Sequence, residues 1–267
     1  MPHRLPPAPA FLTLLLVACG GGQGDEPSPS NTPATPAPTP APAVVIDTPP
    51  DTGDPVADDT PGSVVGVALF PGNAPAREAI EFSGCEHEGG SPPLDNRILI
   101  ADGRLQNVYV TVKSLRGVDS PTPEEPVYLD QLGCMYSPRV IGLQVDQELR
   151  VRNADPLNHN VHVYARRKTF PNNTQAPGAA DFTFVFDRKE PAPVPIGCDI
   201  HPWMKSTVHL SDHPFFAVSD GTGAFKIDGL PPGKHTLTAW HEVYGKLTAK
   251  LDLPPGGTAR VEFTFAE

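Results

Sequence analysis

Short runs of alternating apolar residues, separated by turn residues, make up the chain from residue 61 to its end. Gly, Pro, Asn and Asp interrupt these runs, and no stretch repeats apolar residues at the period of a helix. Alternation with period two buries one face of a strand, and many short strands with frequent turns are typical of a β-sandwich. The sequence therefore predicts an all-β fold, with strands expected at 64–70, 107–115, 140–145, 148–153, 160–164, 182–186, 206–210, 224–227, 234–241, 247–253 and 258–265.

The chain changes character after Pro214. Asp220-Gly221-Thr222-Gly223 predicts a tight turn, and Gly229-Leu230-Pro231-Pro232-Gly233 predicts a connector between strands. This pattern resembles the carboxypeptidase-regulatory-like (transthyretin-like) module, which implies a smaller β-sandwich over residues 212–267. That tail has too few strands for a whole sandwich, so residues 61–125 are expected to pack with either module. Tandem domains and an interleaved pair both fit the sequence.

The first 60 residues are not expected to join a core. Residues 1–18 have a weakly basic start and a short apolar run, which predicts a signal peptide rather than a membrane span. Leu16-Val17-Ala18-Cys19 resembles the lipobox of bacterial lipoproteins, which implies cleavage before Cys19 and lipidation of its thiol. An ordinary signal peptide is the alternative. The lipoprotein interpretation implies an anchored protein of the cell envelope, at the outer membrane, facing the periplasm or the surface.

Residues 19–60 are rich in Pro, Ala and Thr and predict a disordered linker. Seven of the 31 acidic residues lie in this linker, and one of the 20 basic residues, Arg4, lies in the signal. Without the linker and Arg4, the formal net charge changes from −11 to −5. A moderate negative charge of this size is usual for a solvated protein surface and argues against a nucleic-acid partner.

The run Cys198-Asp199-Ile200-His201-Pro202-Trp203-Met204 contains a thiolate, an imidazole and a thioether, with two residues between each and the next. Sulfur ligands with imidazole suit copper, and one Cys, two His and a weak axial Met make a blue-copper site. A second histidine must come from elsewhere. His159 is the leading candidate, because His162 lies three residues along the same strand and should point to the opposite face. His209, His213, His235 and His241 are expected to be structural or exposed.

His159-Asn160-Val161, followed about forty residues later by this loop, resembles the cupredoxins, of the amicyanin and plastocyanin kind. The resemblance covers residues 126–211 and implies a Greek-key β-sandwich. It also implies copper bound by His159, Cys198, His201 and Met204, with Asn160 pinning the cysteine loop. His201 is then expected to be the ligand nearest the surface, with Pro202 and Trp203 in an apolar docking patch around it. The basic run 166–168 and the Pro- and Asn-rich stretch 171–178 depart from the family pattern.

Of the four cysteines, Cys19 is expected to carry lipid and Cys198 to bind metal, which leaves Cys85 and Cys134. Paired thiols in an exported protein are usually bridged, and closing this loop of about 49 residues stabilises the fold by roughly 4 kcal/mol in the chain-entropy model. A second metal site built from Cys85, His87 and Cys134 is the competing interpretation.

Together, these inferences predict a membrane-anchored periplasmic type 1 copper protein that carries single electrons between redox partner proteins. A copper storage or delivery protein and a structural or interaction lipoprotein are the alternatives. An enzyme is not expected. The sequence lacks the sets of His-Xaa-His pairs that further copper ions would need, and it also lacks a haem-attachment motif. Zinc is disfavoured because thioethers are poor zinc ligands.

Overall fold

The computed structural model describes residues 43–47, 57–81, 84–85, 92–113, 115, 118 and 120–266. The signal peptide, Cys19 and most of the linker lie outside these residues, so the predictions made for them stay predictions. The described residues form strands and turns without a helix, which confirms the all-β prediction. Within the same residues, no helix is long and apolar enough to cross a bilayer.

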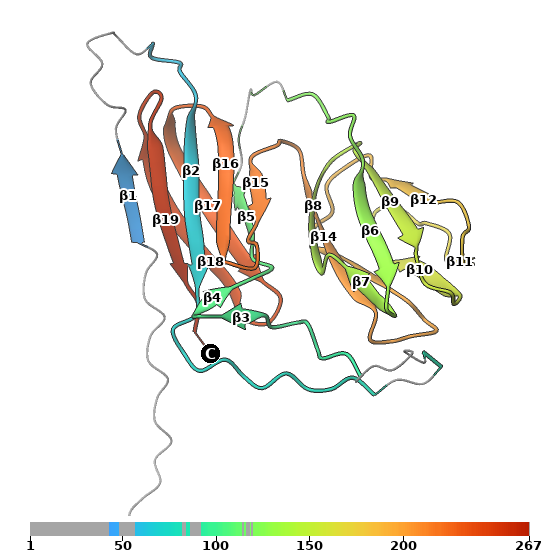
Figure 1. The fold of residues 1–267 in the computed structure, drawn as a ribbon. Coiled ribbons are helices and arrows are strands. Elements are labelled where there is room, and N and C mark those ends of the chain that lie inside the picture. The colour runs from blue at the N-terminus through green and yellow to red at the C-terminus, as the bar shows by residue number, and fades with distance from the viewer. Residues whose placement is uncertain are drawn as a thin grey trace, which may run out of the picture. The chain divides into compact units, whose positions relative to one another are not determined.

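One sandwich, here the outer sandwich, is built from both ends of the folded chain (Figure 1). Its first sheet has the order β1-β19-β2-β4-β3, with β16 also paired to β2, and its second has the order β15-β5-β17-β18. Its strands are β1 (Ala43–Asp47), β2 (Gly62–Leu69), β3 (Ile100–Ala101), β4 (Arg104–Leu105), β5 (Tyr109–Val112), β15 (Phe216–Val218), β16 (Ala224–Leu230), β17 (Gly233–His241), β18 (Gly245–Leu253) and β19 (Thr258–Thr264).

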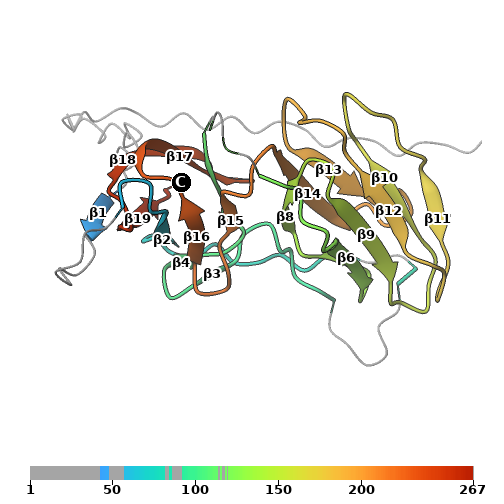
Figure 2. The same ribbon diagram turned by 90° about the horizontal axis from the view of Figure 1, so that it is seen from above.

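The other sandwich, here the inserted sandwich, consists of the chain between β5 and β15. Its sheets have the orders β11-β10-β13-β14-β8 and β12-β9-β6-β7. Its strands are β6 (Val127–Leu132), β7 (Met135–Ser137), β8 (Val140–Gln144), β9 (Glu148–Asn153), β10 (His159–Val163), β11 (Asn173–Gln175), β12 (Phe182–Val185), β13 (Val194–Gly197) and β14 (Lys205–Ser211). Figure 2 shows β13 and β14 side by side next to β8.

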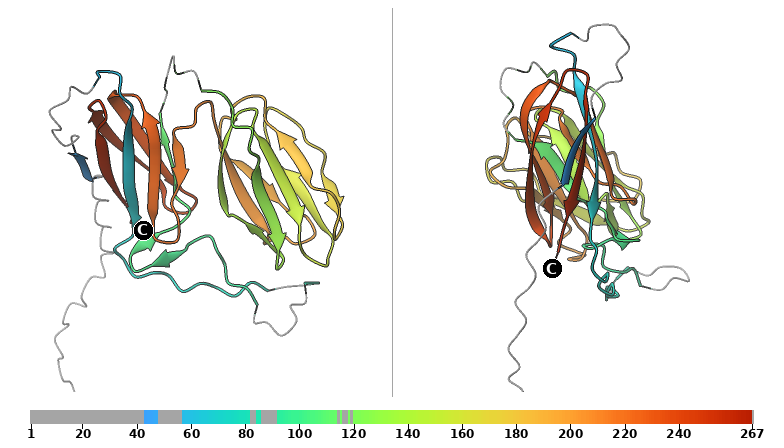
Figure 3. Two further views of the ribbon diagram at one scale, coloured as in Figure 1. Left: turned by 45° about the horizontal axis from the view of Figure 1, so that its top comes forward. Right: turned by 90° about the vertical axis from the view of Figure 1, so that its left-hand side faces the viewer.

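The chain is therefore interleaved rather than tandem. Strand β2 runs parallel to β19 and antiparallel to β16, and β5 pairs with both β15 and β17. The strands of residues 62–112 thus complete the outer sandwich, whose two sheets face each other in Figure 3. Each sandwich has its own apolar core, because alternate residues of its strands point between its sheets.

One prediction for the linker is wrong. Residues Ala43–Asp47 fall inside the stretch expected to be disordered, but they form β1, which pairs antiparallel with β19. Val44, Val45 and Ile46 are β-branched, and β-branched residues fit a pleated sheet. Without β1, the outer edge of β19 would present unpaired backbone groups. Pairing along this edge explains why a short apolar run within a polar linker joins the sheet.

Candidate metal centre

Three ligand-type atoms converge at one end of the inserted sandwich. His159 begins β10, Cys198 follows β13 directly, and His201 lies in the turn before β14. Their ligand atoms lie within 4.8 Å of one another. Nδ1 of His159 is 2.9 Å from Nδ1 of His201, which in turn is 3.8 Å from the Cys198 sulfur. All three residues are buried, with at most 4% of each exposed.

The loop between Cys198 and Met204 is closed by its own backbone. The Cys198 N–H donates to the Met204 carbonyl at 3.2 Å, and the Met204 N–H donates to the His201 carbonyl at 2.9 Å. Met204 is fully buried in the same apolar cluster as Cys198. The loop thus fixes the backbone positions of its Cys, His and Met, and the Met204 side chain is shielded from solvent.

Asn160 ties β10 to this loop. Its side-chain oxygen accepts the N–H of Asp199 at 2.7 Å and the N–H of Ile200 at 3.3 Å. Its own N–H points at the Cys198 sulfur, 3.4 Å away. The Tyr136 hydroxyl donates to the Asn160 carbonyl at 2.7 Å, so the residue is held from both sides. A loop fixed in this way cannot easily change the spacing of its ligand atoms.

Asp155 is also part of the site, beside His159. Its two carboxylate oxygens accept the N–H groups of Gly133 at 2.6 Å and Cys134 at 2.8 Å. One of them also lies 2.9 Å from Nε2 of His159. A carboxylate behind a metal-binding histidine fixes the tautomer and orientation of the ring. The signal in the sequence is the spacing of four between Asp155 and His159, which is too common to be recognised by itself.

The residues fit a single soft metal ion. For a first-row metal such as zinc, bonds of about 2.0 Å to nitrogen and about 2.3 Å to sulfur place two ligand atoms about 3 to 4 Å apart. The separations of 2.9 Å and 3.8 Å in the site lie close to the two ends of this range. A second group of possible ligands combines Cys134, Asp155 and His159. It offers no thiolate, because Cys134 forms a disulfide with Cys85.

The protonation of Cys198 and His201 favours ligand binding. Burial by itself would raise the pKa of the Cys198 thiol, but hydrogen bonds from His159 and from backbone N–H groups bring that pKa below its ordinary value. Burial also lowers the pKa of His201, which favours the neutral imidazole. His159 differs, because burial would lower its pKa but hydrogen bonds with Cys198 and Asp155 raise it. A thiolate and neutral imidazoles are the forms that bind a metal, so a metal competes with a proton at His159.

The Cys85–Cys134 disulfide expected from the sequence is confirmed. The bridged thiols exclude the competing metal site that used both cysteines, and His87 lies outside the described residues. The bridge also lies beside the candidate metal centre. The Cys85 sulfur is 3.7 Å from Nε2 of His201.

The surroundings of His201 differ from the expected exposed docking patch. Only 3% of His201 is exposed, Pro202 is exposed, and Trp203 is half-buried with its Nε1 donating to the Cys134 carbonyl at 2.9 Å. The physical reason is that the chain between β2 and β3, which carries Cys85, extends from the outer sandwich and covers the outer edge of the His201 ring.

The other histidines among the described residues lie outside the site. His162 is half-buried on the other face of β10, stacks on Tyr164 and pairs with Asp199. His213 and His235 bond to backbone carbonyls, His241 accepts backbone N–H groups, and His209 packs against Tyr109 and Trp240. Strand alternation therefore separates His159 from His162 in the structure.

Comparisons with known proteins give distant likenesses in structure only. No protein-family model and no curated protein matches the chain. Amicyanin from Paracoccus versutus is 17% identical, with 38% of this chain and 97% of that one covered and a TM-score of 0.29. The purple cupredoxin from Nitrosopumilus maritimus is 19% identical, with 32% and 99% covered and a TM-score of 0.28.

The chain is also similar to part of a copper-containing nitrite reductase from Thermus scotoductus SA-01. That match has 17% identity and a TM-score of 0.28, and it covers 37% of this chain but 25% of the reductase. These identities and TM-scores are too low to transfer a function to the chain.

Proposed function

We propose that His159, Cys198 and His201 bind one copper ion, with Met204 as a weak fourth ligand, and that the protein carries single electrons between redox partners. The observation that supports this most is the buried convergence of Nδ1 of His159, Sγ of Cys198 and Nδ1 of His201. Two imidazoles, one thiolate and a thioether form the ligand set of an electron-transfer copper site. Bound there, copper would supply one-electron chemistry between Cu(I) and Cu(II).

The surrounding residues suit that role because they keep the ligands in place. Asn160 holds the cysteine loop, Asp155 holds the His159 ring, and the loop closes on its own backbone. A site that keeps one geometry in both oxidation states needs little rearrangement when an electron arrives or leaves. We further propose that lipid on Cys19 anchors the protein in the bacterial cell envelope, as the lipobox resemblance implies, so that its redox partners are envelope proteins.

Copper storage or delivery is the second candidate, and burial of the ligands weighs against it. A delivery protein must release its ion to a partner, whereas here each of the three convergent ligands is at most 4% exposed. The two candidates differ in how fast copper passes to an acceptor. Retention over many redox cycles supports the carrier, and rapid transfer of copper to an apo-protein supports delivery.

Copper titration of the full-length protein in detergent tests the proposal, read by visible absorption and electron paramagnetic resonance. We expect one copper per chain with an intense thiolate-to-copper band. Cys198→Ser and His159→Ala should abolish that band. The matched control is His162→Ala, which removes a histidine of the same strand outside the site and should keep it. A colourless wild-type protein that binds no copper would refute the metal centre.

A further inference from the structure

A long hairpin of the outer sandwich reaches the candidate metal centre. It leaves the sandwich after β2 and returns at β3, and its described residues are 71–81, 84–85 and 92–98, here called the arm. The two limbs pair with each other: the Ile80 N–H donates to the Pro93 carbonyl, and the Asp95 N–H donates to the Glu78 carbonyl, both at 2.8 Å. The arm is therefore an ordered element of the structure.

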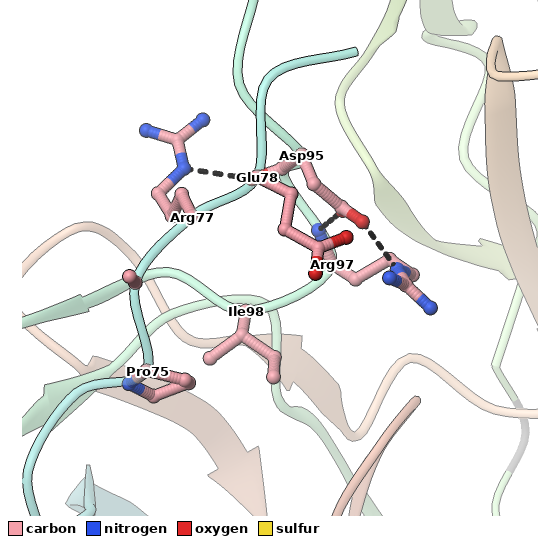
Figure 4. Close-up of a pocket in the computed structure, with 7 residues that line it drawn as sticks. Pro75, Arg77, Glu78, Asp95, Arg97 and Ile98 are labelled. Carbon is pink, nitrogen blue, oxygen red and sulfur yellow. Dashed lines mark hydrogen bonds and ion pairs between the residues drawn. The ribbon is translucent and has the colours of Figure 1, made fainter.

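Arginine side chains strengthen the base of the arm. Nε of Arg77 donates to the Asp95 carbonyl at 2.7 Å, and Arg97 pairs with the Asp95 carboxylate at 2.6 Å (Figure 4). Figure 4 shows these side chains around a pocket that also has Glu78 and Ile98 in its wall. The pairs lie at the surface and contribute little stability each. The Arg77 bond joins the two limbs of the arm to each other, and neither pair attaches the arm to the inserted sandwich.

Among the described residues, a disulfide and a hydrogen bond attach the arm to the inserted sandwich. One is the Cys85–Cys134 disulfide, with both cysteines at most 5% exposed. The other is a hydrogen bond from Nη1 of Arg139 to the side-chain oxygen of Asn96 at 3.1 Å. Between them a cleft of about 200 Å³ separates the arm from the ligand loop, with Ile80 on one side and Trp203 on the other. Apolar packing across this gap is thus incomplete, and the disulfide is the stronger connection.

The disulfide also makes the contact that matters for the site. The Cys85 sulfur lies 3.7 Å from Nε2 of His201, the ring nitrogen on the opposite side of the imidazole from Nδ1. A disulfide sulfur is a weak hydrogen-bond acceptor, so the contact excludes water more than it binds the ring.

We infer that Cys85, held by its bridge to Cys134, is a positioning residue of the metal centre, which closes the outer edge of His201 against water and small ligands. One consequence of this inference, that Cys85 helps the site to retain copper, rests on the proposed function. The covering itself is a property of the chain without metal. Breaking the bridge should free the arm at its strongest connection, and His201 should then become accessible while both sandwiches stay folded.

Labelling of histidines with diethyl pyrocarbonate in the metal-free, full-length protein tests this inference, with the sites mapped by mass spectrometry. Oxidised wild-type protein should protect His201. Dithiothreitol breaks the Cys85–Cys134 bond, leaves a thiol on each residue and is itself oxidised to a cyclic disulfide. After desalting under nitrogen, His201 should be labelled faster by on the order of tenfold or more, because local opening then controls access. Reoxidation should restore protection.

Two variants sharpen the test. Cys85→Ser with Cys134→Ser should label His201 as the reduced protein does, with no response to reductant. Asn96→Ala removes the weaker connection and should leave His201 protected. His162 reports that the reagent is active, and buried His209 reports that the fold is intact. Equal labelling of His201 in oxidised and reduced protein would overturn the inference, and so would loss of protection in Asn96→Ala.

The consequence for the metal is measured separately. Copper-loaded wild-type protein should lose its ion to a small chelator more slowly than the double cysteine variant, by on the order of tenfold. If the wild-type protein binds no copper, the proposed function fails while the labelling result stands. If both proteins bind copper and release it equally fast, the proposed function stands and Cys85 does not control retention.

Discussion

Nε2 of His159 donates its hydrogen to a carboxylate oxygen of Asp155 across 2.9 Å, and this bond decides which nitrogen of the ring is left for a ligand. In the neutral ring that binds a metal, the proton stays on Nε2 and the lone pair lies on Nδ1, which faces Nδ1 of His201. The carboxylate is held in turn by the N–H groups of Gly133 and Cys134. The turn after β9 is thereby connected to the disulfide and to the metal centre through one side chain.

Asp155→Asn should weaken metal binding without removing a ligand. An amide group must turn its NH₂ toward at least one of the N–H groups that the carboxylate now accepts, so the His159 ring loses its fixed orientation. We expect copper affinity to fall by roughly 10- to 100-fold, the usual effect of losing such a partner. Competition with a chelator of known affinity measures this. Asp228→Asn, an exposed carboxylate paired only with Lys226, is the control, and equal affinities in both variants would contradict the role of Asp155.

Met204→Leu should keep copper and raise the reduction potential. A weak thioether donor stabilises Cu(II) more than Cu(I), so its loss favours the reduced ion. The side chain is fully buried, and a volume-conserving change of this kind should cost less than about 1.5 kcal/mol of stability. A redox titration followed in the visible band gives the potential. Met135→Leu is the control in β7, and a lower potential in Met204→Leu would argue against an axial role.

Asn160→Ala should destabilise the folded protein through the cysteine loop. The change leaves the half-buried hydrogen bonds from the N–H groups of Asp199 and Ile200 without their shared acceptor, and the loss of such a bond costs on the order of 0.5 to 1.5 kcal/mol. Urea unfolding of the metal-free protein measures this loss. Asn172→Ala removes side-chain hydrogen bonds to Asn160 and Asp199 from an exposed position and should cost less. Equal stability of the two variants would mean that the loop does not depend on Asn160.

Acid should destabilise the protein in part through His209. Burial against Tyr109 and Trp240 lowers the pKa of His209 from 6.5 to about 3. Between these values the unfolded chain binds a proton that the folded chain does not, so stability falls as the pH falls through this window. His209→Phe should reduce the pH dependence by up to about 1.4 kcal/mol per pH unit.

Urea unfolding of the metal-free protein between pH 4 and pH 7 tests this effect of His209. His241, whose pKa burial lowers to about 4, adds a slope of the same sign that remains in the variant. An unchanged slope in His209→Phe would show that His209 does not titrate in this way.

The all-β fold and the core of the candidate site follow from local patterns in the sequence. Cys198, His201 and Met204 lie within seven residues, so one tight turn brings them together whatever the rest of the fold does. His159 and His162 are three residues apart on one strand. Side chains alternate between the two faces of a strand, so an odd spacing places these two on opposite faces. Such features depend on backbone geometry over a few residues, and they can be predicted from the sequence.

Only the tertiary structure decided how distant segments meet around that loop. Residues 62–112 have the same alternating pattern as the other strands, and nothing in that pattern selects the outer sandwich as their partner. Two cysteines predict a bridge, but not that it covers a histidine 116 residues away from Cys85. The carboxylate of Asp155 likewise finds Gly133 and Cys134 only after β6 and β9 have paired. These contacts depend on packing between elements that lie far apart in the chain. Such packing leaves no local period or spacing in the sequence, so the contacts could not be predicted from it.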